Sequence, residues 1–260
     1  MNLNLAGKKA LVTGGTHGIG KAIAVGLAKQ GCDVAVFSRT KERVIETKET
    51  LDRFQIDNIC LTADVLDESS YSEVEKEIKS NWGGVDIVVN NIGGGGRWGK
   101  PDILQTDDIV WKEVYDKNLT AAMKYTKMFL PHMIKNNWGR VIAITSIYGR
   151  QAGGRPWFNI AKTAQTTLMK NLAIKREYAS SNITFNSVAP GGIWIPNTGW
   201  EDMQKNDPDE FKKFVTSKFP RGSMGTPEEV ANLVLFLCSP YASLINGASI
   251  SADGGESVYF

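Results

Sequence analysis

Short apolar runs alternate along the chain with longer segments in which apolar residues recur at helical spacing. The strand candidates lie at 9–12, 34–37, 59–62, 85–89, 140–145, 184–188 and 248–251, and the helical patterns at 21–30, 41–54, 68–81, 106–135, 156–178 and 227–237. Runs this short suit strands that are buried on both faces, as in a parallel sheet. Strands that alternate with helices pair in parallel through right-handed crossovers. The pattern therefore predicts an α/β fold, a doubly wound parallel sheet with helices on both faces.

One long stretch, 191–224, interrupts this alternation. It contains Trp194, Trp200 and the acidic segment Asp207–Glu210. A loop of this length within a compact domain usually has a function, so we predict a lid over a substrate pocket. The alternative is a peripheral helical excursion that does not contact a ligand. No internal repeat or low-complexity linker divides the chain, and we predict a single domain over residues 1–260.

The charge balance argues against several classes of partner. The 30 Lys and Arg residues and the 28 Asp and Glu residues leave a net charge of +2, which predicts no nucleic-acid partner. The longest uninterrupted apolar run, Leu233–Cys238, is far shorter than the roughly 20 residues that cross a bilayer. The first residues do not have the pattern of an export signal. We therefore expect a cytoplasmic protein without a membrane partner.

Cysteine and histidine are few. Cys32, Cys60 and Cys238 are widely spaced in apolar surroundings, which is typical of buried thiols rather than of disulfides or metal ligands. His17 and His132 are the only histidines, so a site with several His ligands is excluded and a Ser-His-Asp hydrolase is disfavoured. We expect no metal.

A glycine-rich turn follows the first predicted strand and opens the first predicted helix. Gly14, Gly18 and Gly20 let the turn be tight and let the backbone come close to a pyrophosphate. Free backbone N–H groups and the helix dipole would face the phosphate charge there. The turn therefore predicts a dinucleotide site.

Several further motifs follow in order, and with them the chain resembles the short-chain dehydrogenase/reductase family from about Leu5 to Gly255. Residues 13–20 are similar to its TGxxxGIG cofactor motif. Asp64-Val65 resembles its adenine-contacting pair, residues 90–93 its NNAG with Ile92 for Ala, Pro190-Gly191 its nicotinamide-side PG, and Asp253–Gly255 its usual ending. The resemblance implies a Rossmann-type fold and a nicotinamide cofactor. It places the cofactor at Gly14, Thr16, His17, Gly18, Ile19, Gly20, Asp64, Val65, Asn91, Gly93, Lys162, Pro190, Gly191 and Ile193.

The end of the second strand indicates which cofactor is bound. NAD enzymes carry an acidic residue there, which binds the adenosine ribose hydroxyls. This chain has Ser38 and Arg39 instead, and a hydroxyl with a guanidinium suits a 2′-phosphate. His17 stands where NADP-preferring relatives often carry Arg or Lys. We predict NADP(H), the alternative being that residues 38–40 form a solvated turn.

The predicted catalytic set lacks one group. The resemblance implies an active-site Asn at Asn118, a catalytic Ser at Ser146, a Tyr that donates the proton, and a Lys four residues later that binds the nicotinamide ribose. Lys162 is present, but Phe158 stands at the Tyr position, and a phenyl ring has no proton to donate. Ser146 and Phe158 are twelve residues apart, one fewer than in many relatives. Tyr148 lies nearby, and we interpret it as a packing residue.

Three explanations of Phe158 remain. The chain is an engineered inactive Tyr-to-Phe form, or a natural relative that protonates through water, Ser146 or another hydroxyl, or a catalytically silent NADP(H)-binding sensor or assembly subunit. The retained Asn118, Ser146 and Lys162 argue against the third. If the scaffold is otherwise a reductase site, Phe158→Tyr should restore or strongly raise activity.

The predicted function is that of an NADP(H)-dependent oxidoreductase that interconverts a ketone and a secondary alcohol. The segment 221–229 makes the chain similar to the 3-oxoacyl-carrier-protein reductase branch of the family. Several cationic and aromatic residues should rim the substrate pocket and favour an anionic or 3-oxoacyl-type small-molecule substrate. These are Arg97, Trp98, Arg150, Arg155 and Trp194. The alternative is that the arginines bind solvent or backbone carbonyls and that the tryptophans form subunit contacts.

We also predict a homodimer or homotetramer. In the family that the chain resembles, helices equivalent to 106–135 and 156–178 pack against their copies in a partner. The chain ends in Val258-Tyr259-Phe260, which an isolated monomer would tend to expose. We expect these aromatic residues near a subunit boundary.

Overall fold

A sheet of seven parallel strands forms the centre of the molecule, in the order β3-β2-β1-β4-β5-β6-β7. The structure is a computed structural model and describes residues 2–100 and 102–259. The strands are β1 Lys9–Thr13, β2 Asp33–Ser38, β3 Asn58–Thr62, β4 Ile87–Asn90, β5 Gly139–Ile144, β6 Ile183–Pro190 and β7 Ser249–Ala252. The ends of each strand lie within two residues of those of a predicted strand. The predicted doubly wound α/β fold is confirmed.

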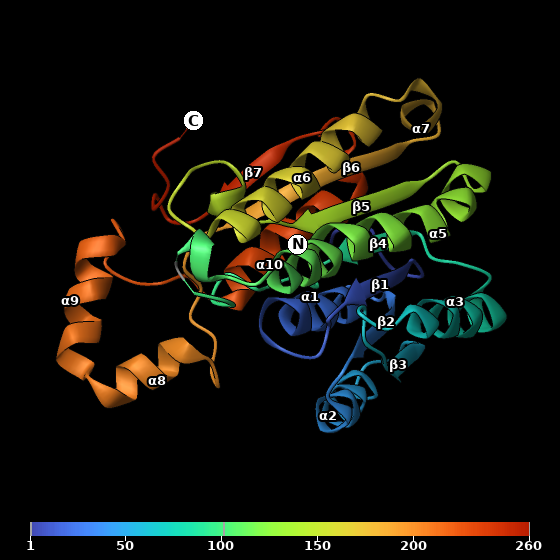
Figure 1. Ribbon diagram of the computed structural model, residues 1–260. Helices are drawn as coiled ribbons and strands as arrows, with labels where there is room; N and C mark the ends of the chain where they lie inside the picture. Colours follow the sequence, from blue (N-terminus) through green and yellow to red (C-terminus); the bar gives the residue numbers. More distant parts are fainter. Residues whose placement is uncertain (1, 101, 260) are drawn as a thin grey trace.

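Helices cover both faces of the sheet (Figure 1). On one face α1 Gly18–Lys29, α2 Lys41–Leu51 and α10 Pro227–Cys238 share an apolar core with the strands. On the other face α3 Glu68–Trp82, α5 Ala121–Lys135 and α6 Pro156–Ala173 enclose a second core. Helices α1 and α10 approach closely, because a Cβ on Gly26 would lie 2.7 Å from a methyl group of Leu235. The sheet is therefore buried on both sides, as its apolar strands require.

Local signals set the ends of several helices. Asp67 caps α3 by accepting a hydrogen bond from the Ser69 backbone N–H, and Gly83 ends that helix in the left-handed conformation. Helix α10 begins with a capping box in which Thr226 and Glu229 each satisfy the other's backbone N–H. The polar contacts fix where α3 and α10 begin, and Gly83 fixes where α3 ends.

Two predicted helices are divided in the structure. The pattern over 106–135 becomes α4 Asp108–Tyr115, a π-helical turn Asp116–Thr120 and α5. The pattern over 156–178 becomes α6 and the short α7 Arg176–Ser180. Apolar periodicity does not distinguish a continuous helix from one interrupted by a single wide turn, because the same face stays apolar through it.

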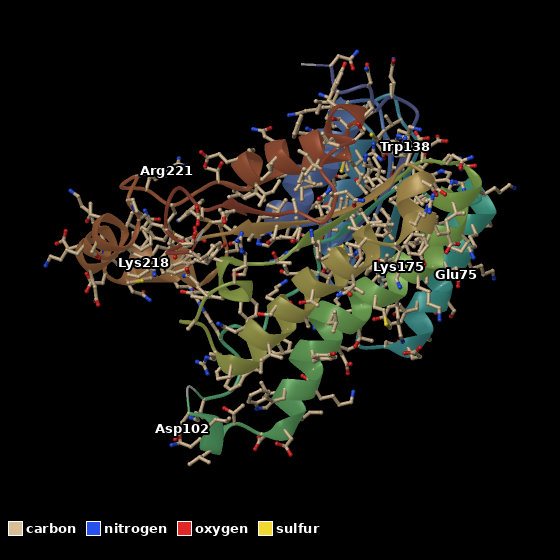
Figure 2. The ribbon with its side chains drawn as sticks, turned by 90° about the horizontal axis from the view of Figure 1, so that it is seen from above. Glu75, Asp102, Trp138, Lys175, Lys218 and Arg221 are labelled. Atoms are coloured by element: carbon tan, nitrogen blue, oxygen red, sulfur yellow. The ribbon has the colours of Figure 1, made fainter. Side chains whose placement is uncertain are left out.

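The segment 191–224 is mostly helical rather than a loop. Its helices α8 Gly199–Asn206 and α9 Pro208–Lys218 project from one end of the sheet (Figure 1). Seen from above, Lys218 and Arg221 lie at that end and Trp138 and Glu75 at the opposite end (Figure 2). The segment has its own small apolar core, with Phe211, Phe219 and Met224 buried and Trp194, Trp200, Met203, Phe214 and Val215 partly buried around them.

Short 3-10 turns complete the fold at η1 Ile103–Gln105, η3 Ile147–Gly149 and η4 Pro240–Ala242. Cys32 and Cys238 are fully buried, as predicted, whereas Cys60 is only partly buried, and none of the three forms a disulfide. Burial raises the pKa of Cys60 to about 11. In the part of the chain that the structure describes, no helix has both the length and the apolar character needed to cross a membrane.

Candidate active site

The glycine turn lies at the carboxyl end of β1, where the strand order reverses between β1 and β4. Ligands of doubly wound sheets bind at this switch point. Gly14 and Gly18 have φ values of 65° and 52°, which side chains disfavour. A Cβ on Gly20 would lie only 2.4 Å from the Gly14 carbonyl oxygen. The turn therefore needs glycine both for its conformation and for its close contact with the first turn of α1.

Two side chains fasten this turn to the end of β4. The Asn91 side-chain amide donates to the carbonyl oxygens of Thr13 at 2.9 Å and Gly14 at 3.2 Å. The Thr13 hydroxyl oxygen accepts from the backbone N–H groups of Asn91 at 2.9 Å and Ile92 at 3.0 Å. Asn91 thus holds the backbone of the glycine turn in place.

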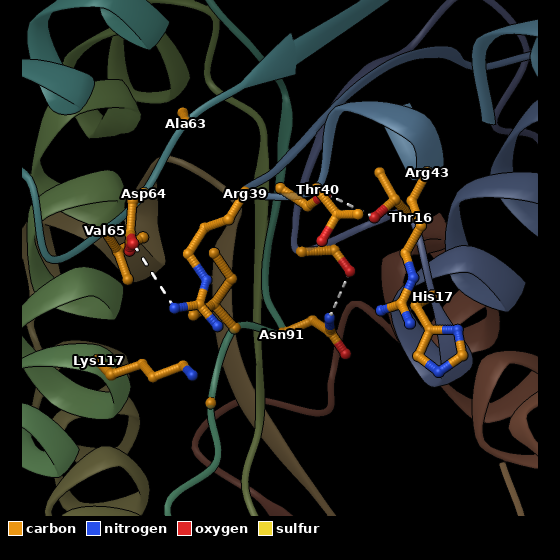
Figure 3. A pocket seen from close by; sticks show the side chains of 14 residues that line it. Thr16, His17, Arg39, Thr40, Arg43, Ala63, Asp64, Val65, Asn91 and Lys117 are labelled. Carbon is orange, nitrogen blue, oxygen red and sulfur yellow. Dashed lines mark hydrogen bonds and ion pairs between the residues drawn. The ribbon is translucent and has the colours of Figure 1, made fainter. Parts of the chain in front are cut away.

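A cavity of about 250 Å³ opens beside the turn, over the ends of β1, β2 and β3 (Figure 3). It brings together nine of the predicted cofactor residues: Gly14, Thr16, His17, Ser38, Arg39, Asp64, Val65, Asn91 and Gly93. Gly18 lines a neighbouring groove with His17. Ile19, Gly191 and Ile193 line a second cavity, described below. Gly20 lies beneath Asn91, and Pro190 ends β6.

The first cavity is rich in cations. Arg39, Arg43 and Lys117 all contribute to its wall, and Asp64 is the one carboxylate among the residues that line it. An Asp64 oxygen lies 3.6 Å from an Arg39 nitrogen, whereas Arg43 lies across the cavity, beside His17 (Figure 3). Burial, with the nearby Arg39, lowers the pKa of Lys117. Four positive or potentially positive groups, His17 included, therefore face a cavity with one acid.

The sequence reasoning missed Arg43 and Lys117. Arg43 follows Arg39 by four residues in the first turn of α2, and this spacing could have indicated it. Lys117 precedes Asn118 in the π-helical turn, and no sequence signal pointed its side chain toward the cavity.

Hydroxyl and imidazole groups complete this wall. The Thr16 hydroxyl donates to the Ser38 hydroxyl oxygen at 2.8 Å and joins the glycine turn to the end of β2. The His17 Nε2 atom is buried and has no hydrogen-bond partner within the described residues. Burial lowers the pKa of His17, and the charges of Arg43 and Lys21 add to this effect. A neutral imidazole with a free nitrogen thus lies beside the guanidinium of Arg43.

Asn118 is fully buried in the π-helical turn between α4 and α5. Its amide nitrogen donates to the carbonyl oxygens of Val114 at 2.7 Å and Gly94 at 2.9 Å, and its oxygen accepts from the Gly94 N–H at 3.2 Å. A π-helical turn often marks a functional site because it redirects a side chain. Here it lets Asn118 hold the glycine segment that follows β4.

Lys162 is buried on α6, close to the same glycine segment. Its ammonium nitrogen donates to the Ile144 carbonyl at 2.8 Å and to the Gln165 side-chain oxygen at 3.0 Å. Burial lowers the pKa of Lys162 to about 7. A Cβ on Gly93 would lie 2.7 Å from both this nitrogen and the Asn118 oxygen. Glycine at 93 therefore leaves open the space between the two polar groups.

A second cavity, of about 600 Å³, lies against Ser146 and Phe158. The Phe158 ring centroid is 5.9 Å from the Lys162 nitrogen, as the spacing of four on α6 requires. The Ser146 hydroxyl oxygen accepts from the Tyr148 N–H at 3.2 Å and caps η3. Tyr148 also lines this cavity. Of the predicted catalytic side chains, Ser146 and Phe158 face this space, and Asn118 and Lys162 lie behind the glycine segment.

The projecting helices supply the outer, mostly apolar wall of this cavity. The charged groups of that wall are Arg97, Lys218 and Glu256, and Arg97 lies over Trp200 with its guanidinium carbon 4.8 Å from the ring centroid. The Glu256 carboxylate is 4% exposed, accepts from the Gly192 N–H at 2.6 Å and lies 3.6 Å from the Lys218 nitrogen. The apolar lining comes from Ile19, Ile147, Ile193, Ile195, Trp200, Phe214 and Phe219. The sequence reasoning missed Lys218 and Glu256.

Four of the five predicted substrate residues do not line this cavity. Arg150 donates to the Ser249 carbonyl at 2.9 Å, and Arg155 donates to the carbonyls of Trp98 and Gly99. Trp98 packs beside Lys117, and Trp194 belongs to the apolar core of the projecting segment. The two arginines bind backbone carbonyls, which was the alternative interpretation for them, and the two tryptophans pack within the chain. Only Arg97 of the five lines the cavity.

The arrangement defines a nucleotide-binding α/β protein with a second, substrate-sized cavity near its glycine turn. Comparison with known proteins gives the family. Residues 14–257 match the family model described as enoyl-(acyl carrier protein) reductase. The chain is 36% identical over 257 residues to a 3-oxoacyl-[acyl-carrier-protein] reductase of Aquifex aeolicus, covering 98% of this chain and 99% of that protein. The chain belongs to the short-chain dehydrogenase/reductase family.

Two other relatives differ in their named substrates. A tropinone reductase homolog of Arabidopsis thaliana is 35% identical over 262 residues, covering 98% of this chain and 94% of that protein. The L-sorbose reductase of Gluconobacter frateurii, solved with NADPH and L-sorbose, superposes with a TM-score of 0.91 at 29% identity over the full length of both chains. Similar degrees of likeness to three different reductases do not select one substrate.

Proposed function

We propose that this protein is an NADP(H)-dependent oxidoreductase that interconverts a ketone and a secondary alcohol. The observation that carries the proposal is the cluster of Arg39, Arg43 and His17 around the first cavity, with no acidic residue at the end of β2. Guanidinium groups bind phosphate through paired, charge-assisted hydrogen bonds. The L-sorbose reductase solved with NADPH supports the same cofactor.

The residues present fit such a cofactor. Gly14 lines the first cavity without a side chain, so the backbone of the glycine turn can come close to a pyrophosphate there. The buried His17 Nε2 has no partner, and such a group is costly unless a ligand satisfies it. Arg39, Arg43 and His17 would hold the 2′-phosphate, Val65 the adenine, and Lys162 the nicotinamide ribose. When bound, the nicotinamide supplies or accepts a hydride.

Ser146 would act directly on the carbonyl oxygen of the substrate, whereas Asn118 would act through the protein backbone. The Ser146 hydroxyl donates no hydrogen bond to any residue that the structure describes, and it would donate one to that oxygen. Asn118 fixes the glycine segment at Gly94 and so keeps the floor of the site rigid. Lys162, held by Ile144 and Gln165, places its side-chain nitrogen behind Phe158. We further propose that the segment 191–224 acts as the lid of the substrate cavity.

The charge of the second cavity favours an anionic substrate. A 3-oxo acid, with its carboxylate, is one such substrate. Lys218 is paired with Glu256, whereas Arg97 forms no ion pair with any residue that the structure describes. We expect Arg97→Gln to lower kcat/KM for a keto acid about 10- to 100-fold, the size of one lost charge-assisted hydrogen bond. The same substitution should change kcat/KM for the neutral ester of that acid less than about threefold.

The proposal is tested by NADPH oxidation with a panel of 2-keto acids, their methyl esters, L-sorbose and acetoacetyl thioesters. Arg155→Gln is the matched control, because its guanidinium binds backbone carbonyls outside the cavity wall. Turnover of ketones with NADPH supports the proposal. Absence of NADPH binding would refute it, and equal losses for the acid and its ester would refute the role of Arg97.

A second function is favoured by one observation, the phenyl ring of Phe158 at the family's Tyr position. A protein that binds NADP(H) without turnover would act as a sensor or assembly subunit. Tight NADPH binding without oxidation of any panel substrate, in both the native protein and Phe158→Tyr, would favour this function over catalysis.

We also propose a homodimer or homotetramer. Ile109, Met123 and Ile160 are exposed on α4, α5 and α6, the helices expected to meet their copies. At the chain end Val258 is exposed, but the Tyr259 hydroxyl is 3.0 Å from that of Ser251, and Phe260 lies outside the described residues. Light scattering should give a multiple of 28.5 kDa, and a mass near 28.5 kDa at micromolar concentration would contradict the prediction.

A further inference from the structure

The second cavity lacks the phenol that the family places at position 158, yet another phenol lies in its wall. Tyr148, on the turn η3, lines the cavity together with Ser146 and Phe158. We infer that Tyr148 is the proton donor to the carbonyl oxygen in this chain. The inference rests on the proposed ketone reduction, and it replaces our interpretation of Tyr148 from the sequence as a packing residue.

The other polar groups of the cavity wall are unsuited to donating a proton to the carbonyl oxygen. Arg97 keeps its proton under all ordinary conditions. The Glu256 carboxylate accepts from the Gly192 N–H and pairs with Lys218, so both side chains are already engaged in contacts of their own. The Thr198 hydroxyl already donates to the Ile195 carbonyl at 2.7 Å. Of the described residues that line this cavity, only Ser146 and Tyr148 retain hydroxyl protons without an acceptor.

The acidity of the two hydroxyls separates their roles. A phenol is a much stronger acid than an aliphatic alcohol, so it transfers a proton to a developing alkoxide far more readily. The Ser146 hydroxyl oxygen also accepts the Tyr148 N–H, which fixes η3 relative to the catalytic serine. Ser146 is therefore the group that orients the carbonyl oxygen and Tyr148 the group that protonates it.

The loop before α6 is shaped to hold the Tyr148 ring. A Cβ on Gly153 would lie 3.1 Å from ring carbon Cε1, and one on Gly154 would lie 3.2 Å from Cγ. Gly153 also has a φ of 120°, which other residues disfavour. Two successive glycines thus let the backbone lie directly against the ring. Tyr148 is therefore held by its backbone N–H, which donates to Ser146, and by the two glycines beside its ring, as a catalytic group must be.

In reduction the carbonyl carbon receives a hydride and the oxygen receives the phenolic proton, so C=O becomes CH–OH. NADPH is the reductant and becomes NADP⁺. Tyr148 is left as a phenolate, which regains its proton from water through the open side of the cavity. Oxidation of the alcohol runs through the same groups in reverse.

The test compares the native protein with Tyr148→Phe, Phe158→Tyr and the double variant, using the substrate panel above. Tyr148→Phe keeps the ring and the N–H contact with Ser146 and removes only the hydroxyl. We expect its kcat to fall by about 10²- to 10⁴-fold, as for loss of a general acid. Its KM and its dissociation constant for NADPH should change less than about threefold, because the hydroxyl acts mainly in the transition state.

Rescue and control variants separate a chemical role from a structural one. The double variant Tyr148→Phe/Phe158→Tyr should regain at least about tenfold over Tyr148→Phe, because it returns a phenol to the cavity. Phe158→Tyr alone should gain little, in contrast to the expectation from the sequence. Tyr241→Phe, on the surface, should match the native kcat. The native kcat should show a solvent deuterium isotope effect that Tyr148→Phe alters.

Three results would overturn the inference. Tyr148→Phe could keep its kcat within threefold of native. The native protein could be inactive while Phe158→Tyr turns over, which would leave the proposed function intact and remove Tyr148 from it. All variants could bind NADPH and reduce nothing, in which case the proposed function itself fails.

Discussion

Replacement of Arg39 by Asp should reverse the order in which NADPH and NADH stabilise the protein against heat. In the native protein NADPH should raise the melting temperature more than NADH at equal concentration, since tighter binding gives greater stabilisation. One hydrogen bond between charged groups contributes about 1.5 to 3 kcal/mol, or about 10- to 150-fold in affinity. An Asp at 39 would repel the 2′-phosphate and could accept hydrogen bonds from the ribose hydroxyls of NADH.

Arg43 enlarges the expected effect. Arg39→Asp/Arg43→Ala should weaken NADPH binding by about 10² to 10⁴-fold, because both guanidiniums of the cavity are lost. Arg53→Asp makes the same charge change as Arg39→Asp on an exposed residue that does not line the cavity, and it should leave the preference for NADPH unchanged. Equal stabilisation of the native protein by the two cofactors would refute the assignment, as would a similar loss in Arg53→Asp.

The fold could be predicted from the sequence because strand burial leaves a direct pattern. Strands covered on both faces are rich in apolar residues, so β2 and β4 carry the continuous apolar runs 34–37 and 87–89. The division of the helix expected over 106–135 had no such signal. The apolar periodicity of a regular helix would also bury Asn118, so its burial does not distinguish the π-helical turn from a regular helix. Only the contacts of Asn118 with Val114 and Gly94 show the wider turn.

The cofactor cavity was more predictable than the substrate cavity. Gly14, Thr16 and Arg39 belong to short segments at strand ends, whose position follows from the sheet order. The substrate wall is built from segments distant in sequence: Glu256 reaches Gly192 across 64 residues. Such contacts depend on the path of the projecting helices, which local patterns do not encode.

Arg150 and Arg155 illustrate the same limit. Both occur in the loop expected to rim the pocket, and their charge predicted substrate contacts. In the structure each donates to backbone carbonyls that the fold leaves without partners, at Ser249 and at Trp98. Which carbonyls need a partner is a property of the assembled backbone, so charge and position in the chain could not reveal it.

Lys162 should make the stability of the cofactor-free protein depend on pH. Burial lowers its pKa to about 7 in the folded state, whereas an exposed lysine keeps a pKa near 10.5. Between these values the unfolded chain binds a proton that the folded protein does not, so a fall in pH favours unfolding. Stability from this group is complete above about 10.5, is lost as the pH falls toward about 7, and changes no further below that.

The expected size is large. A pKa difference of this extent corresponds to roughly 5 kcal/mol, with a slope approaching about 1.4 kcal/mol per pH unit in the middle of the range. Lys162→Met removes the titrating group and keeps an unbranched side chain. The unfolding free energy of the native protein, measured in urea, should rise relative to that of Lys162→Met as the pH is raised from 7 to 9. Lys170→Met, on the exposed side of the same helix, should follow the native curve. Parallel curves for native and Lys162→Met would contradict the shifted pKa.

The same lysine should link cofactor binding to proton uptake. Above its pKa near 7 the free protein holds Lys162 mostly neutral, whereas an anionic cofactor close to it favours the ammonium form. Binding of NADPH at pH 8 should therefore take up a proton in the native protein, and NADPH affinity should decline as the pH rises further. Calorimetry in buffers of different ionisation enthalpy measures this uptake. Proton uptake by Lys162→Met equal to that of the native protein would show that another group titrates and would remove Lys162 from the cofactor's electrostatic surroundings.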